Sequence, residues 1–235
     1  MKHFDKQPLA GYKKWKKKAE DATEQNRQKE QKRFSEMRMA WSMSPTKFDI
    51  KGYFGEFDRK FPGTQNHIRQ KIADRKAAGK DILMVDLAGF ADGESLGIQT
   101  ISATLSTEFV DGDGKTTILK PQKGQTFVSG DLLTPETQKK LVEQIQAAHL
   151  PVSFIFFLPI AGVEVYEGNP YAAISFTHLL KLLYPFLEAG GEIFLDFSSL
   201  ASENVPDLQK MLSDIGAIVS RKGESFRVTK PATNK

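Results

Sequence analysis

The chain has 235 residues, of which 40% are hydrophobic and 26% are charged, and its formal net charge at pH 7 is +4. This length can form one α/β domain with an extension, without support from disulfides or metal. The absence of cysteine excludes cysteine-ligated zinc and a cysteine nucleophile, and it favours a reducing compartment. We expect a cytoplasmic protein without a membrane segment, because the lysine-rich N-terminus precedes no apolar stretch of a signal peptide or a membrane span.

The positive charge is concentrated at the N-terminus, where residues 1–40 hold 12 Lys and Arg against 6 Asp and Glu. Residues 9–40 lack proline and are rich in Lys, Glu, Gln and Ala, which predicts a helix. Interleaved Glu and Gln between Glu20 and Glu36 favour a solvated helix. A basic segment of this kind also has the charge to contact nucleic acid or a partner protein.

Residues 41–65 mix aromatic residues with glycine and proline, which is typical of an ordered connector. We interpret these aromatic side chains as packing against the domain, in preference to a platform for stacking bases, because they carry large apolar area. The sequence thus divides into an extension with its connector, residues 1–65, and an α/β domain, residues 66–235. The aromatic residues concerned are Phe48, Tyr53, Phe54, Phe57 and Phe61.

The domain is expected to begin with a helix over 66–78, which Gly79 ends, followed by a buried strand over 82–85 that leads into Asp86. Residues 98–109 fit either a β-branched strand or an amphipathic helix. The turn-rich DGDGK that follows favours the strand, because it connects to TTIL as in a hairpin.

The run from Phe154 to Leu158 is apolar at every position, as expected of a strand covered on both faces in a parallel sheet. Helices and strands alternate through the rest of the domain. The pattern predicts a Rossmann-like α/β fold, with a mostly parallel sheet, helices on both faces and a C-terminal antiparallel hairpin. The further elements are a strand over 125–129, a helix over 135–148 with Thr134 as N-cap, a helix from Asn169-Pro170, a strand after Gly190-Gly191, a helix over 206–215, and a hairpin turning at Lys222 and Gly223.

This order of elements, with the loop MVDLAGFADG after the first strand, resembles the class I S-adenosylmethionine-dependent methyltransferases over about residues 66–230. The resemblance implies that S-adenosylmethionine is the cofactor and the small-molecule methyl donor. In this family the first strand ends in an acidic residue and leads into a glycine-rich loop, which passes beneath the methionine part of the cofactor. The usual spacing D-x-G-x-G-x-G is incomplete, because Ala88, Phe90 and Asp92 stand at its glycine positions. The loop residues expected at the cofactor are Asp86, Ala88, Gly89, Phe90 and Gly93.

The resemblance implies three further cofactor-binding positions. Thr104 stands where the family has a carboxylate for the ribose hydroxyls, and Asp131 follows the third strand, where an acidic residue often meets the adenine amino group. Leu158 ends the fourth strand, beside the expected substrate. No catalytic residue is identified, which is compatible with methyl transfer because positioning of donor and acceptor supplies most of its catalysis.

The resemblance implies a methyltransferase, and the sequence leaves its acceptor open. The alternative is a catalytically inactive module of the same fold that binds a partner protein or nucleic acid through residues 1–40. A dehydrogenase is disfavoured because G-x-G-x-x-G is absent. No metal site is expected, since DGDGK fails the calcium-loop pattern at Thr116 and Gln122 and the four histidines are scattered.

Overall fold

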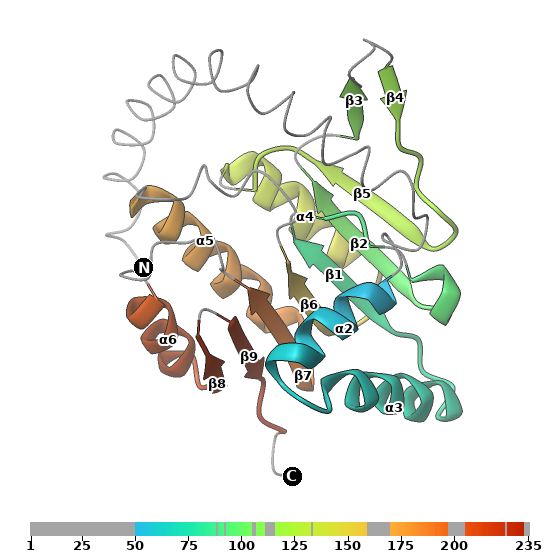
Figure 1. The fold of residues 1–235 in the computed structure, drawn as a ribbon. Coiled ribbons are helices and arrows are strands. Elements are labelled where there is room, and N and C mark those ends of the chain that lie inside the picture. The colour runs from blue at the N-terminus through green and yellow to red at the C-terminus, as the bar shows by residue number, and fades with distance from the viewer. Residues whose placement is uncertain are drawn as a thin grey trace.

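The computed structural model describes residues 50–87, 89–91, 93–104, 107–110, 116–132, 134–158, 170–196, 205–223 and 225–232 (Figure 1). The helices are α2 (Ile50–Lys60), α3 (Thr64–Ala77), α4 (Pro135–Ala147), α5 (Pro170–Leu183) and α6 (Val205–Asp214), with 3-10 turns η2 (Glu94–Leu96) and η4 (Tyr184–Phe186). The strands are β1 (Leu83–Leu87), β2 (Gln99–Thr104), β3 (Glu108–Val110), β4 (Thr116–Ile118), β5 (Gln125–Ser129), β6 (Val152–Phe157), β7 (Leu187–Asp196), β8 (Ile218–Lys222) and β9 (Ser225–Thr229).

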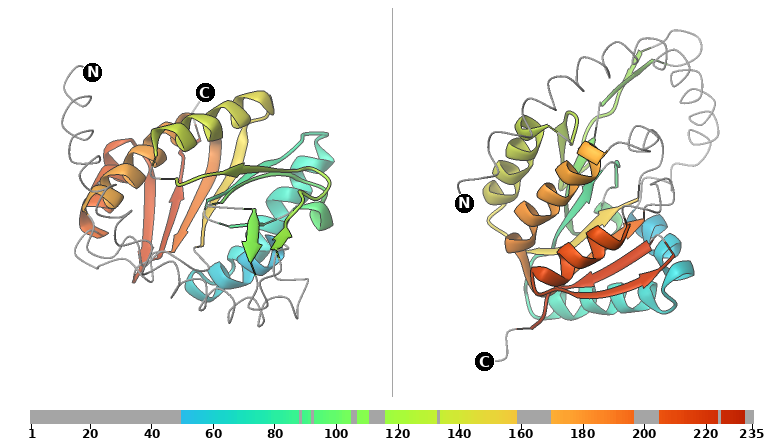
Figure 2. Two further views of the ribbon diagram at one scale, coloured as in Figure 1. Left: turned by 90° about the horizontal axis from the view of Figure 1, so that it is seen from above. Right: turned by 90° about the vertical axis from the view of Figure 1, so that its left-hand side faces the viewer.

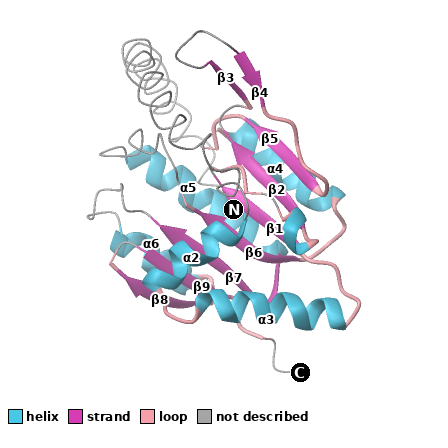
Figure 3. Cartoon of the chain, turned by 45° about the vertical axis from the view of Figure 1, so that its right-hand side comes forward, coloured by secondary structure: helices cyan, strands magenta, loops and turns pink. Residues whose placement is uncertain are grey.

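Seven strands form one sheet in the order β5-β2-β1-β6-β7-β9-β8, and β3 and β4 form a separate hairpin that stands off it (Figure 3). The first five strands in this order are parallel, and β9 is antiparallel to both β7 and β8. The five parallel strands follow the 3-2-1-4-5 order of a doubly wound sheet. The predicted Rossmann-like fold with a closing antiparallel hairpin is therefore confirmed.

Helices cover both faces of the sheet (Figure 2). We call the face under α4, α5 and α6 the back face and the face under α2 and α3 the front face. Alternate residues of a strand point to opposite faces, so Ile155 and Phe157 of β6 join the back cluster while Phe154 and Phe156 join the front cluster. This explains why the run from Phe154 is apolar without alternation.

The connection from β1 to β2 differs from the three crossovers that follow β5, β6 and β7. Those after β5, β6 and β7 contain α4, α5 and α6, whereas the described residues between β1 and β2 form only the turn η2. A right-handed crossover in this direction lies on the face opposite α4 and α5, and Ala91 and Ile98 are accordingly buried in the front cluster. The rest of the front face is covered by α2 and α3, which precede β1 in the chain.

Helix α2 lies within residues 1–65, the segment that the sequence assigns to an extension. Its Tyr53, Phe54 and Phe57 are buried, and each ring centroid lies within 6.2 Å of that of Phe156 on β6. The packing interpretation of these three residues is therefore confirmed. Phe61 is half-buried, while Phe48 and the helix predicted over 9–40 lie outside the described residues.

The local signals of the sequence account for most element ends. Gly79 has a positive φ of 66° just after α3, and Thr134 accepts a hydrogen bond from the Thr137 N–H at the start of α4, as predicted. The segment 98–109 forms strands β2 and β3, and β3 pairs antiparallel with β4 as a hairpin requires. The connecting DGDGK lies outside the described residues. No helix in the described part of the chain could cross a membrane.

Candidate functional site

The carboxyl ends of β5, β2, β1 and β6 meet at one edge of the sheet, because these neighbouring strands are parallel. We call it the carboxyl edge. The strands that follow β1 in the chain lie on both sides of it in the sheet, with β2 and β5 on one side and β6 and β7 on the other. Such a switch point between β1 and β6 is where doubly wound folds bind ligands. Four predicted residues lie at these strand ends. Asp86 and Thr104 are among the last two residues of β1 and β2, and Asp131 and Leu158 follow β5 and β6 by two residues and one residue.

Asp86 points to the front face and is fully buried. Its Oδ2 accepts hydrogen bonds from the Ala91 N–H at 2.8 Å and from the Tyr53 hydroxyl at 3.2 Å. Burial raises the pKa of Asp86 to about 7, and the two hydrogen bonds oppose this rise because they favour the carboxylate. Among the described residues, none gives a hydrogen bond to Oδ1.

Tyr53 enters the site from α2 and is a residue that the sequence interpretation treated as packing alone. Burial, followed by the charge of Asp86, raises the pKa of its hydroxyl well above the usual value. Its ring packs edge-on against Phe156. One sequence signal could have identified it, because a buried tyrosine hydroxyl generally needs a polar partner, unlike the phenylalanines around it.

The residues after β1 fold tightly over Asp86. A Cβ atom at Gly89 would overlap Asp86 Oδ2 and the Tyr53 hydroxyl, so the backbone here passes too close for any side chain. The Ala91 carbonyl accepts hydrogen bonds from Ser102 Oγ at 2.7 Å and from Gln125 Nε2 at 2.9 Å. Residues 89–91, which we call the first loop, are thus held against the sheet from both sides.

Two other predicted loop residues lie away from Asp86. Phe90 is half-buried and packs edge-to-face against Phe127 of β5, with ring centroids 6.1 Å apart. Gly93 lies against Ile98 and Thr100 at the beginning of β2, so the structure places it at the end of that strand opposite to Thr104. Gly93 is therefore not brought together with the strand-end residues. Ala88 lies outside the described residues.

The remaining predicted residues follow their strands closely. Thr104 is buried at the end of β2, and its carbonyl accepts a hydrogen bond from the Gly130 N–H at 2.9 Å. Asp131 is half-buried, and its carbonyl accepts from the Thr134 hydroxyl at 2.8 Å, which fixes the approach to α4. Leu158 packs against the front cluster. The Gly130–Thr104 hydrogen bond links the ends of the neighbouring strands β2 and β5, and the packing of Leu158 anchors the end of β6.

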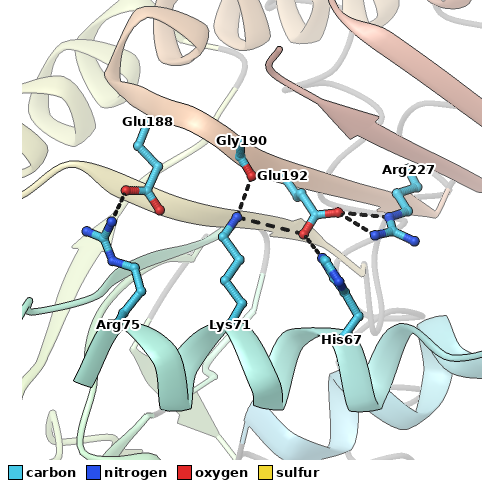
Figure 4. A network of polar contacts seen from close by, with 7 residues as sticks. All are labelled: His67, Lys71, Arg75, Glu188, Gly190, Glu192 and Arg227. Carbon is cyan, nitrogen blue, oxygen red and sulfur yellow. Dashed lines mark hydrogen bonds and ion pairs between the residues drawn. The ribbon is translucent and has the colours of Figure 1, made fainter. Parts of the chain in front are cut away.

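A second buried carboxylate on the front face, Glu192 of β7, was not identified from the sequence (Figure 4). Its Oε1 accepts from Arg227 Nε at 2.8 Å and Nη2 at 2.7 Å, and its Oε2 lies 2.7 Å from His67 Nε2 and 3.8 Å from Lys71 Nζ. Lys71 also donates to the Gly190 carbonyl, and burial lowers its pKa. We call these side chains the Glu192 cluster, and it joins α3 to β7 and β9.

The described residues offer no group of three His, Asp or Glu side chains that could hold a metal ion. Among the described residues, the polar groups at the carboxyl edge include backbone groups and the side chains of Asp86, Tyr53, Thr104 and Asp131. Such groups can hold and orient a polar ligand. The carboxyl of Asp86 can also take up or release a proton near neutral pH.

A comparison with protein-family models finds no match, and neither does one with curated proteins. Solved structures similar in fold include MycE, a methyltransferase of the mycinamycin biosynthetic pathway in complex with Mg and SAH, with 12% identity and a TM-score of 0.42 over 79% of this chain and 48% of MycE. The O-methyltransferase NovP has 13% identity and a TM-score of 0.41 over 71% of this chain and 78% of NovP. A Plasmodium falciparum protein described as a ribosomal RNA methyltransferase has 13% identity and a TM-score of 0.39 over 70% and 95%. This chain spans about half the length of MycE, and these likenesses concern the fold alone.

Proposed function

We propose that this chain is an S-adenosylmethionine-dependent methyltransferase that binds its cofactor at the carboxyl edge. The observation that carries the proposal is the meeting of four parallel strand ends at the switch point between β1 and β6. This is the place where folds of this kind bind nucleotide-like ligands. Asp86, Thr104, Asp131 and Leu158, which the sequence proposed independently, belong to these strand ends.

The residues present at this edge fit such a cofactor in two respects. Asp86 Oδ1 is a buried acceptor without a partner among the described residues, so a donor group of a ligand would satisfy it. The absence of a side chain at Gly89 lets the backbone of the first loop lie directly against Asp86, as a close approach of loop and ligand requires.

The first loop, Thr104, Asp131 and Leu158 are the groups that would hold the cofactor, with Asp86 shaping the loop from beneath. Bound there, the cofactor would supply a methyl group already activated on its sulfonium. The protein would contribute mainly the orientation of this group towards an acceptor. A general base is therefore not required by the proposal.

Binding of the cofactor or its product is the direct test. Isothermal titration with S-adenosylmethionine and S-adenosylhomocysteine should show one site, and Asp131→Asn should weaken it about tenfold if the carboxylate contacts the adenine amino group. Thr126 is exposed at the beginning of β5, the strand that Asp131 follows. Thr126→Ala is therefore the matched control and should bind as the wild type does. No heat and no thermal stabilisation at millimolar concentrations of either ligand would overturn the proposal.

One observation favours a second candidate, a binding module without catalysis. The first loop is closed onto the sheet by the protein's own groups, Gly89 against Tyr53 and Ala91 against Gln125 and Ser102. In that case residues 1–40, which lie outside the described residues, would carry the binding. Fluorescence anisotropy with a short RNA duplex, compared between the full chain and a variant lacking residues 1–40, tests this alternative. Equal binding by both proteins, or none by either, would contradict nucleic-acid binding through residues 1–40 and leave a partner protein as the form of this alternative to test.

We further propose that the domain begins at or before Ile50. Helix α2 supplies three buried aromatic residues to the front cluster, and the polar contact of Tyr53 with Asp86 links it to β1. Limited proteolysis should therefore leave α2 within the stable fragment. A stable fragment that starts near residue 66 would instead agree with the boundary inferred from the sequence.

A further inference from the structure

The connection between β1 and β2 leaves the first loop without a helix of its own. In the crossovers after β5, β6 and β7 a helix packs on the sheet and fixes the chain on both sides of it, whereas here the described residues form a single 3-10 turn. The first loop lies at the switch point, where a ligand site requires a defined backbone. Some other part of the molecule must therefore hold it.

Helix α2 occupies this place on the front face. Tyr53 and Ala91 both belong to the front cluster, and Phe54 and Phe57 anchor α2 on β6 beside β1 (Figure 1). The hydroxyl of Tyr53 is fixed by this packing, since its ring is buried and meets Phe156 edge-on. The helix thus carries a polar group to a defined point beneath the first loop.

Helix α2 meets the first loop both directly and through Asp86. Asp86 Oδ2 accepts from the Tyr53 hydroxyl and from the Ala91 N–H, and the backbone of Phe90 also makes a hydrogen bond with the Tyr53 hydroxyl. Gly89 lies directly against the Asp86 carboxyl and the Tyr53 hydroxyl, so Asp86 cannot adopt another position without moving the loop. Tyr53 is also the titratable side chain that acts on Asp86, and the loop contributes only a backbone N–H.

We propose that Tyr53 is a positioning residue of the carboxyl edge, because through Asp86 it sets the conformation of the first loop. Helix α2 thereby fixes this loop on the sheet, as the helices of the crossovers after β5, β6 and β7 fix theirs. The consequence for ligand affinity rests on the function proposed above. The control of the loop by Tyr53 does not, and it can be measured without ligand.

The variant Tyr53→Phe removes the hydroxyl and keeps the ring. Asp86 then loses one of the two donors that stabilise its charged form, so the pKa of Asp86 should rise above the wild-type value. Above neutral pH, Asp86 and the backbone of Phe90 lose their common link to α2, so the first loop should open more often and hydrogen exchange of the Ala91 N–H should become about tenfold faster. At pH 5, where Asp86 is protonated in both proteins, the difference should shrink.

The experiment follows Asp86 by its carboxyl carbon resonance and Ala91 by amide exchange, in the full chain at pH 5 and pH 8.5. Phe54→Leu is the matched control, since it removes apolar volume from the same helix without touching Asp86. It should destabilise the protein while leaving the Asp86 titration in place. The proposal is overturned if Tyr53→Phe changes neither the titration nor the exchange of Ala91, or if Phe54→Leu changes both equally.

Titration with S-adenosylhomocysteine completes the test and separates the two proposals. If the wild type binds, Tyr53→Phe should weaken binding about fivefold, as expected when one hydrogen bond that shapes the site is lost. Unchanged affinity in this variant, with wild-type binding intact, would overturn the link between Tyr53 and the ligand site. If the wild type does not bind, the cofactor proposal fails, while the titration and exchange data still decide the role of Tyr53.

Discussion

Asp86 and Glu192 are both buried carboxylates on the front face of the sheet, but their surroundings are opposite. Glu192 receives an arginine, a lysine and a histidine, and both of its oxygens have partners. Asp86 receives two neutral donors on one oxygen, and its other oxygen has no partner among the described residues. Buried charges that stabilise a fold are paired, while incompletely satisfied ones that titrate near neutrality are typical of functional sites. The contrast supports our proposal that Asp86 belongs to the ligand site, whereas Glu192 stabilises the framework.

The largest expected effect is the pH dependence of stability caused by Asp86. Its pKa is about 7 in the folded protein against 3.8 ordinarily, so between these values the folded state keeps a proton that the unfolded chain has lost. The free energy of unfolding should therefore fall as the pH rises through this window, by at most about 4 kcal/mol in all and by at most about 3 kcal/mol between pH 5 and pH 7. Asp86→Asn should remove this dependence, measured by urea unfolding from pH 5 to pH 8.5.

Glu192→Gln is the control for that measurement, because it changes the other buried carboxylate. It should lower stability at every pH and keep the pH dependence due to Asp86. A variant Asp86→Asn with the same slope as the wild type would show that Asp86 is ionised throughout, and the contrast between the two carboxylates would disappear.

Glu192→Gln itself should give the next largest effect. The guanidinium of Arg227 and the ammonium of Lys71 would lose their common counter-charge, with only 28% and 18% of these side chains exposed. Breaking a buried ion pair from one side is strongly destabilising, and we expect a loss of about 3 kcal/mol in urea unfolding. Glu143→Gln removes the exposed pair with Lys139 on α4 and should change stability by less than about 1 kcal/mol. Equal effects of the two substitutions would mean that the Glu192 cluster does not anchor α3.

A smaller effect is expected from Gln125→Ala, which changes a contact of the first loop above Asp86. Gln125 Nε2 donates to the Ala91 and Phe90 carbonyls at 2.9 and 3.0 Å, so its loss leaves buried acceptors of the first loop with fewer donors. We expect a loss of about 1 to 2 kcal/mol and faster hydrogen exchange at Ala91. Gln144→Ala, at an exposed position of α4, is the control. Unchanged exchange at Ala91 would show that the first loop is held from the α2 side alone.

The sequence predicted the fold well because its signals are local. Gly79 and Thr134 mark helix ends within a few residues, and the unbroken apolar run from Phe154 marks a strand covered on both faces. The strand-end positions of Asp86, Thr104, Asp131 and Leu158 follow from the same reasoning, because parallel strands share one carboxyl edge. A correct order of elements therefore brings these four residues to a common place.

The polar pairs were not predictable in the same way. Tyr53 and Asp86 are 33 residues apart, and His67 and Glu192 are 125 residues apart, so no local pattern connects them. Gly93 shows the limit of motif spacing: without a helix between β1 and β2, the chain returns at once to the beginning of β2 and takes Gly93 with it. The motif spacing alone did not indicate this early return of the chain, because it assumes that a helix follows the loop.

The smallest expected effect concerns His67, the most exposed member of the Glu192 cluster. Its side chain is 45% exposed, and Arg227 occupies the other oxygen of Glu192 independently of it. His67→Ala should therefore cost about 0.5 to 1 kcal/mol in urea unfolding, in the range of exposed pairs. His67→Gln, whose amide can donate to Glu192 Oε2, should recover part of this loss. A loss of stability as large as that caused by Glu192→Gln would mean that the Glu192 cluster acts as one cooperative unit. The position of Glu192 would then depend on each of its partners, as we propose that Asp86 depends on Tyr53.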